Sequence, residues 1–135
     1  MAYKIDEIEG IGPAMKEKLA AADIKTTDDL LDQCASKKGR AATAGTTGCS
    51  EGQLLKWANM ADLMRISGVG EAVSELLEAA GVDTVKELRN RNAANLAVAM
   101  KETNDEKKLT RTVPSEKTVT KWVEQAKELD PLITH

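Results

Sequence analysis

The chain has 135 residues, of which 41% are hydrophobic and 30% are charged, and its formal net charge is −3. This length suits one compact domain, and the near balance of charge excludes a global field that attracts nucleic acid, so any polyanion binding has to be local. With no Phe, one Tyr and two Trp, the core has to be filled by Leu, Ala, Val, Ile and Met, a set that favours helices over sheets.

Apolar residues recur at steps of three and four along much of the chain, as in Met15, Leu19 and Ala22, which is typical of amphipathic helices. Gly81 and Asp23 follow two such runs at positions where a left-handed residue ends a helix. The sequence therefore predicts an all-α protein with helices at residues 13–22, 27–34, 37–44, 51–66, 71–80, 85–91, 93–102 and 115–129.

Capping boxes mark three of the predicted helix starts. One begins at Thr84 and ends at Glu87, another begins at Ser50, and a weaker version begins at Thr26. In each, the first side chain accepts a hydrogen bond from a free amide of the first helical turn, and the fourth side chain bonds back.

The sequence also indicates an internal duplication. A shift of 58 residues aligns residues 8–12 with 66–70, and a shift of 65 residues aligns Lys56-Trp57 with Lys121-Trp122. We expect tandem units at residues 1–66 and 61–135 that share the helix 51–66. Because a shared continuous helix fixes the units against each other, we expect a single rigid domain over residues 1–135.

The first glycine turn (residues 8–12) and the second glycine turn (residues 66–70) have the pattern hydrophobic-x-Gly-hydrophobic-Gly, which is typical of helix-hairpin-helix motifs. Glycines allow a tight turn and a close approach to another molecule. Free amides at the start of the next helix favour an anion, so a nucleic-acid phosphate is the natural ligand. The candidate contacts are Gly10, Ile11, Gly12 and Ala14, and Gly68, Val69 and Gly70.

Two interpretations of the first glycine turn stay open. Lys16 and Lys18 stand close enough to supply phosphate contacts, although Pro13 removes one amide donor. In the alternative, the glycines only pack two helices, and the hydrophobic residues of the turn belong to the core. For the second glycine turn the structural role is favoured, because Glu71, Glu75 and Glu78 occupy the dipole that a phosphate would use.

Two basic clusters precede the last predicted helix of each unit: Lys37, Lys38 and Arg40, and Lys107, Lys108 and Arg111. They are interpreted either as degenerate second hairpins that extend a phosphate path or as solvated basic loops. Trp57 and Trp122 occupy matching positions with helical spacing to apolar neighbours, so we expect core anchors and not base-stacking platforms.

No catalytic, cofactor or metal site is predicted. Cys34 and Cys49 have no partners at ligand spacing, and the sole histidine is His135, so no catalytic triad or metal cluster can be assembled. No apolar stretch approaches the 18 or so residues that span a bilayer, and the first ten residues lack a signal core. We expect a cytoplasmic protein with reduced thiols, no membrane association and no small-molecule substrate.

The run of residues 66–88 resembles helix-hairpin-helix domains, including the C-terminal domain of the bacterial RNA polymerase alpha subunit, which contacts DNA backbone and activator proteins. A closer resemblance, over nearly the whole chain, is to the domain-of-unknown-function family 4332, through residues 8–13, 54–57, 61–66 and 114–116. It implies the tandem helical fold and no particular activity. The strongest DNA binders with this motif carry a basic residue just after the second glycine, where this chain has Ala14 and Glu71-Ala72.

These observations favour a non-enzymatic module that binds nucleic acid, most simply DNA, through the phosphate backbone without sequence preference. The alternative is a protein-interaction or scaffold domain with purely structural hairpins. The two are separated by whether the basic residues share one face of the folded chain.

Overall fold

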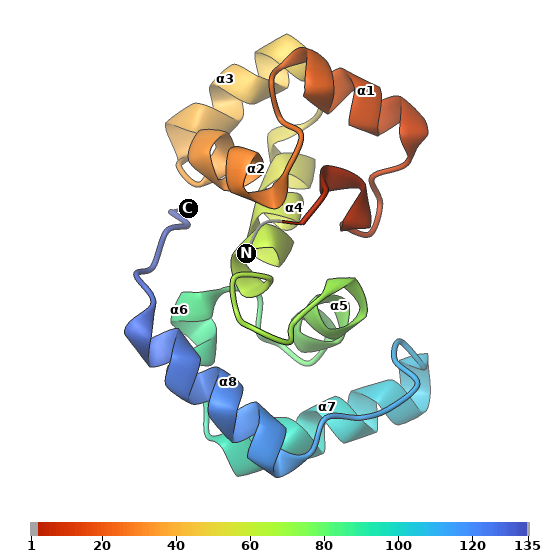
Figure 1. Cartoon of the computed structure of the whole chain (residues 1–135), viewed down its shortest axis with the longest axis vertical. Coiled ribbons are helices and arrows are strands. Elements are labelled where there is room, and N and C mark those ends of the chain that lie inside the picture. The colour runs from red at the N-terminus through yellow and green to blue at the C-terminus, as the bar shows by residue number, and fades with distance from the viewer. Residues whose placement is uncertain (1–2, 135) are drawn as a thin grey trace.

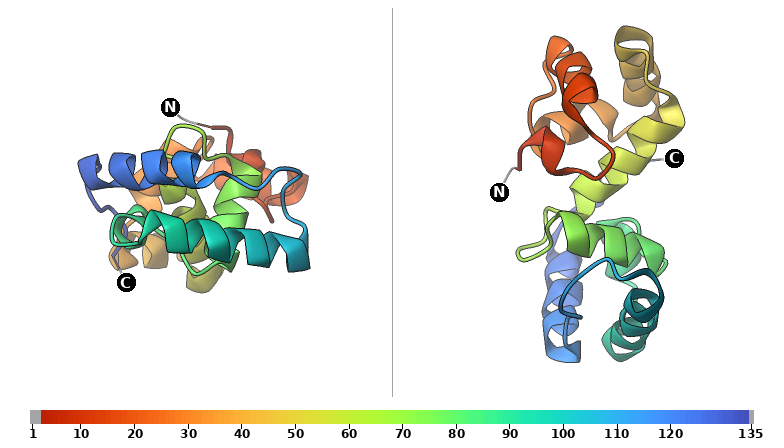
Figure 2. Two further views of the ribbon diagram at one scale, coloured as in Figure 1. Left: turned by 90° about the horizontal axis from the view of Figure 1, so that it is seen from below. Right: turned by 90° about the vertical axis from the view of Figure 1, so that its right-hand side faces the viewer.

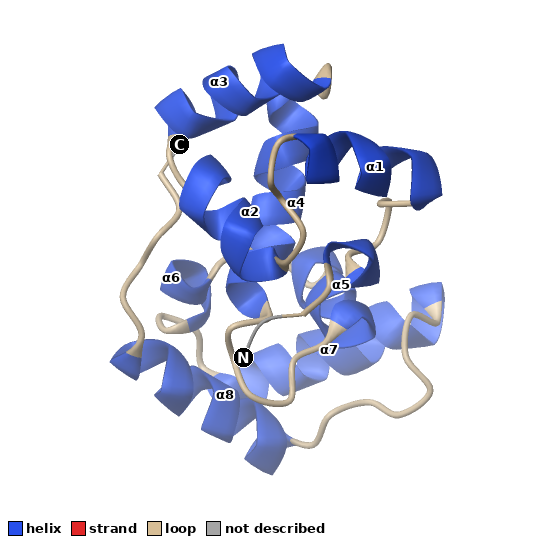
Figure 3. Ribbon diagram, turned by 45° about the horizontal axis from the view of Figure 1, so that its top comes forward, coloured by secondary structure: helices blue, strands red, loops and turns tan. Residues whose placement is uncertain are grey.

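The computed structural model describes residues 3–134, and over this range the chain forms eight α-helices, one 3₁₀ helix and no strand (Figure 3). The 3₁₀ helix η1 (Ile5–Glu7) comes first. The α-helices are α1 (Pro13–Ala21), α2 (Thr27–Cys34), α3 (Lys37–Thr47), α4 (Glu51–Leu63), α5 (Glu71–Ala79), α6 (Val85–Leu88), α7 (Ala93–Lys107) and α8 (Glu116–Glu128). The predicted all-α class is confirmed.

Most helix ends lie within a residue or so of their predicted positions, and the differences have local causes. Helix α3 runs on past residue 44 to Thr47, where the Gly48 amide donates to the Ala44 carbonyl at 2.9 Å and Gly48 ends the helix with φ +79°. Helix α7 continues past residue 102 until Lys108 takes φ +52°. Helix α4 stops at Leu63, short of residue 66, and α6 is a single turn.

The predicted caps form, but the box at Thr26, predicted to be the weaker one, is complete, whereas the box at Thr84 is not. Thr26 accepts from the Asp29 amide and the Asp29 carboxylate accepts from the Thr26 amide, so this box is complete. At Thr84 only the bond from the Glu87 amide is present. Asp23 has φ +64° and Gly81 has φ +100°, as predicted for residues that end helices.

The buried apolar residues form two clusters that meet on α4. Figure 1 shows α1, α2 and α3 in the upper half and α5, α6, α7 and α8 in the lower half, with α4 running between them, and the right-hand view of Figure 2 shows the same stacking. The first cluster takes Trp57 and Met64 from this region, and the second takes Leu63 and Ile66. Trp57 and Trp122 are both buried, one in each cluster, as predicted.

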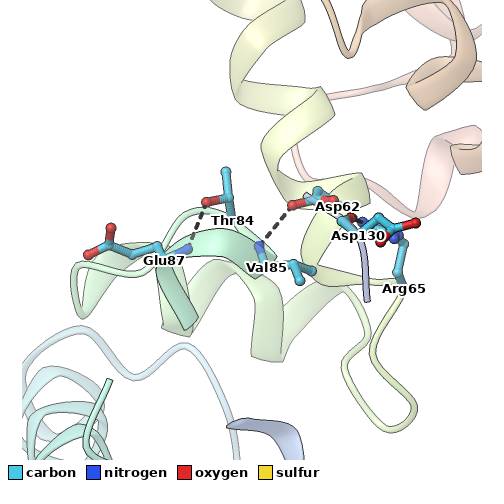
Figure 4. Close-up of polar contacts among 6 residues, drawn as sticks. All are labelled: Asp62, Arg65, Thr84, Val85, Glu87 and Asp130. Carbon is cyan, nitrogen blue, oxygen red and sulfur yellow. Dashed lines mark hydrogen bonds and ion pairs between the residues drawn. The ribbon is translucent and has the colours of Figure 1, made fainter. Parts of the chain in front are cut away.

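A buried carboxylate joins α4 to the second cluster (Figure 4). Asp62, in the last turn of α4, is 1% exposed. One carboxylate oxygen lies 2.7 Å from Nη1 of Arg65, and the other accepts from the Val85 amide at 2.8 Å. Since Val85 is the first residue of α6, Asp62 satisfies an amide that the helix itself leaves free. This bond fixes α6 against the end of α4.

Candidate nucleic-acid interface

The first glycine turn leads into α1 and leaves the first amides of that helix uncapped. Gly10 has φ +95°, and a Cβ placed there would stand 3.3 Å from the indole nitrogen of Trp57. Ile11 is buried. Gly12 is the N-cap of α1 with φ −89° and ψ −175°, and no side chain accepts a bond from the first turn. No atom lies within 4 Å of the position that a Cβ of Gly12 would take.

The second glycine turn repeats this geometry before α5. Gly68 has φ +91°, and its Cβ position is 3.3 Å from the indole nitrogen of Trp122. Val69 is buried. Gly70 is the uncapped N-cap of α5 with φ −103° and ψ −160°, and its Cβ position is also open. The positions paired by the 58-residue shift therefore share one backbone conformation.

The four glycines thus fall into two kinds. Gly10 and Gly68 are required by the turn, because their positive φ and the nearby indole both disfavour a side chain. Gly12 and Gly70 adopt an extended conformation that any residue adopts, in open space. A Ser or Asp at these N-caps would stabilise the helix better than glycine. The turn does not require glycine at either position, and a residue without a side chain leaves the amides that follow open to a close approach by an anion.

The starts of α1 and α5 differ in the charged side chains around them. Glu71, in the first turn of α5, lies beside Glu9 of the first glycine turn. Although much of its side chain is exposed, desolvation of the carboxyl raises the pKa of Glu71, and the neighbouring Glu9, Glu75 and Glu7 raise it further. The start of α5 is therefore surrounded by carboxylates, and these occupy the dipole that a phosphate would use. This arrangement disfavours a phosphate at the second glycine turn, whose structural role stays a prediction.

The start of α1 has a different surrounding. Lys16 and Lys18 are exposed in its first two turns. The ammonium of Lys16 lies 3.4 Å from a carboxylate oxygen of Asp6, an exposed ion pair that solvent weakens. Lys18 is in no ion pair with any residue from 3 to 134. Ala14 is also exposed, and because Pro13 has no N–H, the first amide donor of this helix is that of Ala14.

The first basic cluster does not extend this surface. Arg40 is 3% exposed, and its guanidinium donates to the carbonyls of Cys34 at 3.0 Å and Ala35 at 2.9 Å and to that of Thr134. These bonds satisfy carbonyls at the end of α2, so Arg40 is not placed to contact a phosphate, contrary to its predicted role. Lys37 and Lys38 are exposed in the first turn of α3. Figure 1 shows that turn on the left and the start of α1 on the right.

The second basic cluster lies in a stretch of the sequence that holds few carboxylates. Lys107, Lys108 and Arg111 are exposed on the end of α7 and the connection to α8. Lys117 and Lys121 add two exposed cations on α8. These two were not among the predicted contacts, although their four-residue spacing places them on one face. Between residues 107 and 121 the only carboxylate is Glu116, and none of the five cations pairs with a described residue.

Asn104 shapes this region by closing the connection between the two helices. Its side chain accepts from the Thr110 amide at 2.9 Å and donates to the Thr110 carbonyl at 3.0 Å. In the left-hand view of Figure 2, α7 and α8 lie side by side with this connection at one end. The connection between the two helices is thus held to α7 by Asn104, while the cations of residues 107–121 are exposed to solvent.

The remaining titratable groups of the described residues are not gathered into a metal site. Over residues 3–134, no three His, Cys, Asp or Glu side chains are placed to hold a metal ion, and no helix is long and apolar enough to cross a membrane. Cys34 and Cys49 are buried free thiols, and burial raises the pKa of the Cys34 thiol. His135 lies outside the described residues.

Comparison with known proteins yields a family and no closer relative. No curated protein and no solved structure matches the chain. The similarity to helix-hairpin-helix domains and to the polymerase alpha subunit accordingly stays a prediction from the glycine turns. Residues 9–129 match the family described as domain of unknown function (DUF4332). This match covers residues 9–12 of the first glycine turn, the whole second glycine turn and all eight α-helices, and the chain belongs to this family.

Proposed function

We propose that this protein is a non-enzymatic module that binds the nucleic-acid backbone without sequence preference at the start of α1. The observation that carries the proposal is Gly12, an N-cap glycine in open space that the turn does not require. It leaves the first amides of α1 free for an anion. Since phosphates are the same along any strand, such contacts carry no sequence information.

The charges near Gly12 support this site. Lys16 and Lys18 lie within two turns of the free amides, and a phosphate would compete with Asp6 for the Lys16 ammonium. Figure 1 shows the start of α1 and the end of α7 on the same side of the molecule. The end of α7, which carries Lys107 next to Lys108, therefore attracts a polyanion to this side, although the net charge of the chain is negative.

The contact set is narrower than the sequence predicts. Gly12, Ala14, Lys16 and Lys18 form the proposed contact, with Lys107, Lys108 and Arg111 as a second region of attraction. Gly10 and Gly68 shape the turns, and Ile11 and Val69 fill the cores. Arg40 is internal, Gly70 is surrounded by carboxylates, and Lys37 and Lys38 lie at the other end of the first unit.

A binding titration with matched variants tests the proposal. We expect fluorescently labelled duplex and single-stranded DNA of mixed sequence to bind at low salt. For about four phosphate contacts, affinity falls about 100-fold between 50 and 200 mM salt. Lys16→Gln with Lys18→Gln lowers affinity about tenfold, whereas the control Lys37→Gln with Lys38→Gln changes it less than about threefold. Absence of binding at low salt, or equal losses in the two variants, contradicts the proposal.

A second candidate function, docking of a protein partner, is favoured by a different observation. Two adjoining hollows of about 320 and 340 Å³ lie along α4 and α5 and share Lys56 and Glu78. Their walls carry more carboxylates than cations, since Glu9, Glu75 and Asp83 add to Glu78 and only Lys107 adds to Lys56. A basic peptide segment would complement this excess of negative charge. Titration with a lysine oligopeptide, followed by NMR shifts of residues 75–83, tests this function. Shifts there without DNA binding would favour it over the first proposal.

A further inference from the structure

The residues that follow α8 leave the second cluster and lie on the first unit. Leu129 ends α8 in an extended conformation, with φ −96° and ψ 143°. Four residues later, Ile133 is only 9% exposed and belongs to the first hydrophobic cluster. Figure 1 shows this segment, residues 129–134, running along the left side from α8 up to α2 and α3. It spans both halves of the molecule.

Polar contacts to its main chain hold the segment at both ends. Near α4, Arg65 donates to the Asp130 carbonyl at 3.0 Å from the same nitrogen that pairs with Asp62 (Figure 4). At the corner between α2 and α3, the Thr134 amide donates to the Ala35 carbonyl at 2.9 Å, and Arg40 donates to the Thr134 carbonyl. The buried Arg40 therefore binds the end of α2 and this segment together.

Apart from α4 itself, which contributes to both clusters and bonds to α6 through Asp62, few contacts join the two halves. Helix α4 packs on α2 and α3 above and on α5 below, and no pair of helices from α1–α3 and α5–α8 packs extensively within the described chain. On the side away from the segment, Tyr3 donates from its hydroxyl to the Val69 carbonyl at 3.4 Å. Glu9 and Glu71 meet there with like charge, which adds no attraction.

We propose that residues 129–134 form a releasable strap that holds the two clusters at their observed angle. Its docking depends on one buried side chain, Ile133, and on main-chain bonds to Ala35 and Arg40. Release allows the second half to change its angle to the first about the end of α4, within the restraint of the Asp62 bond to the Val85 amide and the burial of Leu63 in the second cluster. The strap restrains the spacing between the start of α1 and the basic segment 107–121 whether or not either binds nucleic acid.

The test uses the full chain and a matched pair of substitutions. Ile133→Asp places a carboxylate in the first cluster, whereas Leu132→Asp makes the same change at a neighbouring side chain that is 40% exposed. We expect hydrogen exchange of the Thr134 amide to accelerate at least tenfold in Ile133→Asp. Small-angle X-ray scattering gives a larger maximum dimension for this variant, with helix content by circular dichroism unchanged. Leu132→Asp keeps the wild-type values.

A second variant decides the matter if Ile133→Asp loses helix content. Thr134→Pro removes the amide that bonds to Ala35 and keeps every side chain of the first cluster. Expansion of Thr134→Pro in scattering, with native helix content, supports the strap. A wild-type dimension in the folded release variants overturns the proposal, and so does an equal expansion in Leu132→Asp.

Discussion

Alanine substitutions at the four turn glycines should separate those that the fold requires from those that it does not. At Gly10, alanine has to adopt φ +95°, which costs about 1–2 kcal/mol. Its Cβ would also stand 3.3 Å from the Trp57 indole, so the ring has to shift by a few tenths of an ångström. Reduced entropy of the unfolded chain returns roughly 0.4–1 kcal/mol. We expect a net loss of about 1–2 kcal/mol, and the same at Gly68.

Gly12 and Gly70 supply the matched controls. Alanine fits their extended conformation without contact, and the entropic gain roughly offsets its poorer quality as an N-cap. We expect the free energy of unfolding to change by less than about 0.5 kcal/mol. Urea denaturation followed by fluorescence of the two tryptophans measures all four variants. In thermal melts, each kcal/mol lost lowers the Tm by about 3–5 °C. A Gly12→Ala loss as large as that of Gly10→Ala refutes the reasoning.

Three further predictions concern single side chains. Arg40→Ala should lower the free energy of unfolding by about 2–4 kcal/mol, because three carbonyls lose a charged donor. A loss in urea denaturation no larger than that of Lys38→Ala, at an exposed side chain, contradicts this prediction. Asn104→Ala should cost about 1–3 kcal/mol and accelerate exchange of the Thr110 amide, and unchanged exchange argues against its closing role. The pKa of Glu71 is raised in the folded chain, so the folded chain holds this proton more tightly than the unfolded chain does. The free energy of unfolding therefore falls as pH rises from the ordinary pKa of a glutamate through the raised pKa of Glu71. Glu71→Gln should therefore stabilise the protein at pH values above that range and not below it. The gain is about 0.5 kcal/mol or less, because solvent screens the carboxylate. Urea denaturation that shows the same effect of the substitution above and below the range contradicts this prediction.

The parts of the fold that could be predicted from the sequence depend on neighbouring residues. The box at Thr26, the left-handed Gly81 and the burial of Trp57 follow from patterns a few residues long. All three form, and the box at Thr26 is more complete than expected. The end of α7 could not be placed in the same way. Its Thr103-Asn104-Asp105 run is typical of a loop, but the Asn104 side chain bonds to Thr110 and the helix continues.

The candidate site depends more on contacts between distant residues. Arg40 belongs to a basic run, yet it is buried because Thr134, 94 residues away, lies against it. Glu9 and Glu71 come together only because the two halves pack around α4. The sequence identifies four glycines with one motif, whereas their φ angles and surroundings distinguish Gly10 and Gly68 from Gly12 and Gly70.

Gly12→Asp tests the proposed binding site most directly. Aspartate is a good N-cap, so this variant should fold at least as stably as the wild type, while its carboxylate occupies the free amides of α1 that a phosphate would use. Gly70→Asp makes the same change beside Glu71, where no binding is proposed. In low-salt titrations with labelled DNA, we predict that Gly12→Asp lowers affinity at least about tenfold and that Gly70→Asp changes it less than about threefold. Equal affinities of the wild type and Gly12→Asp would contradict the account.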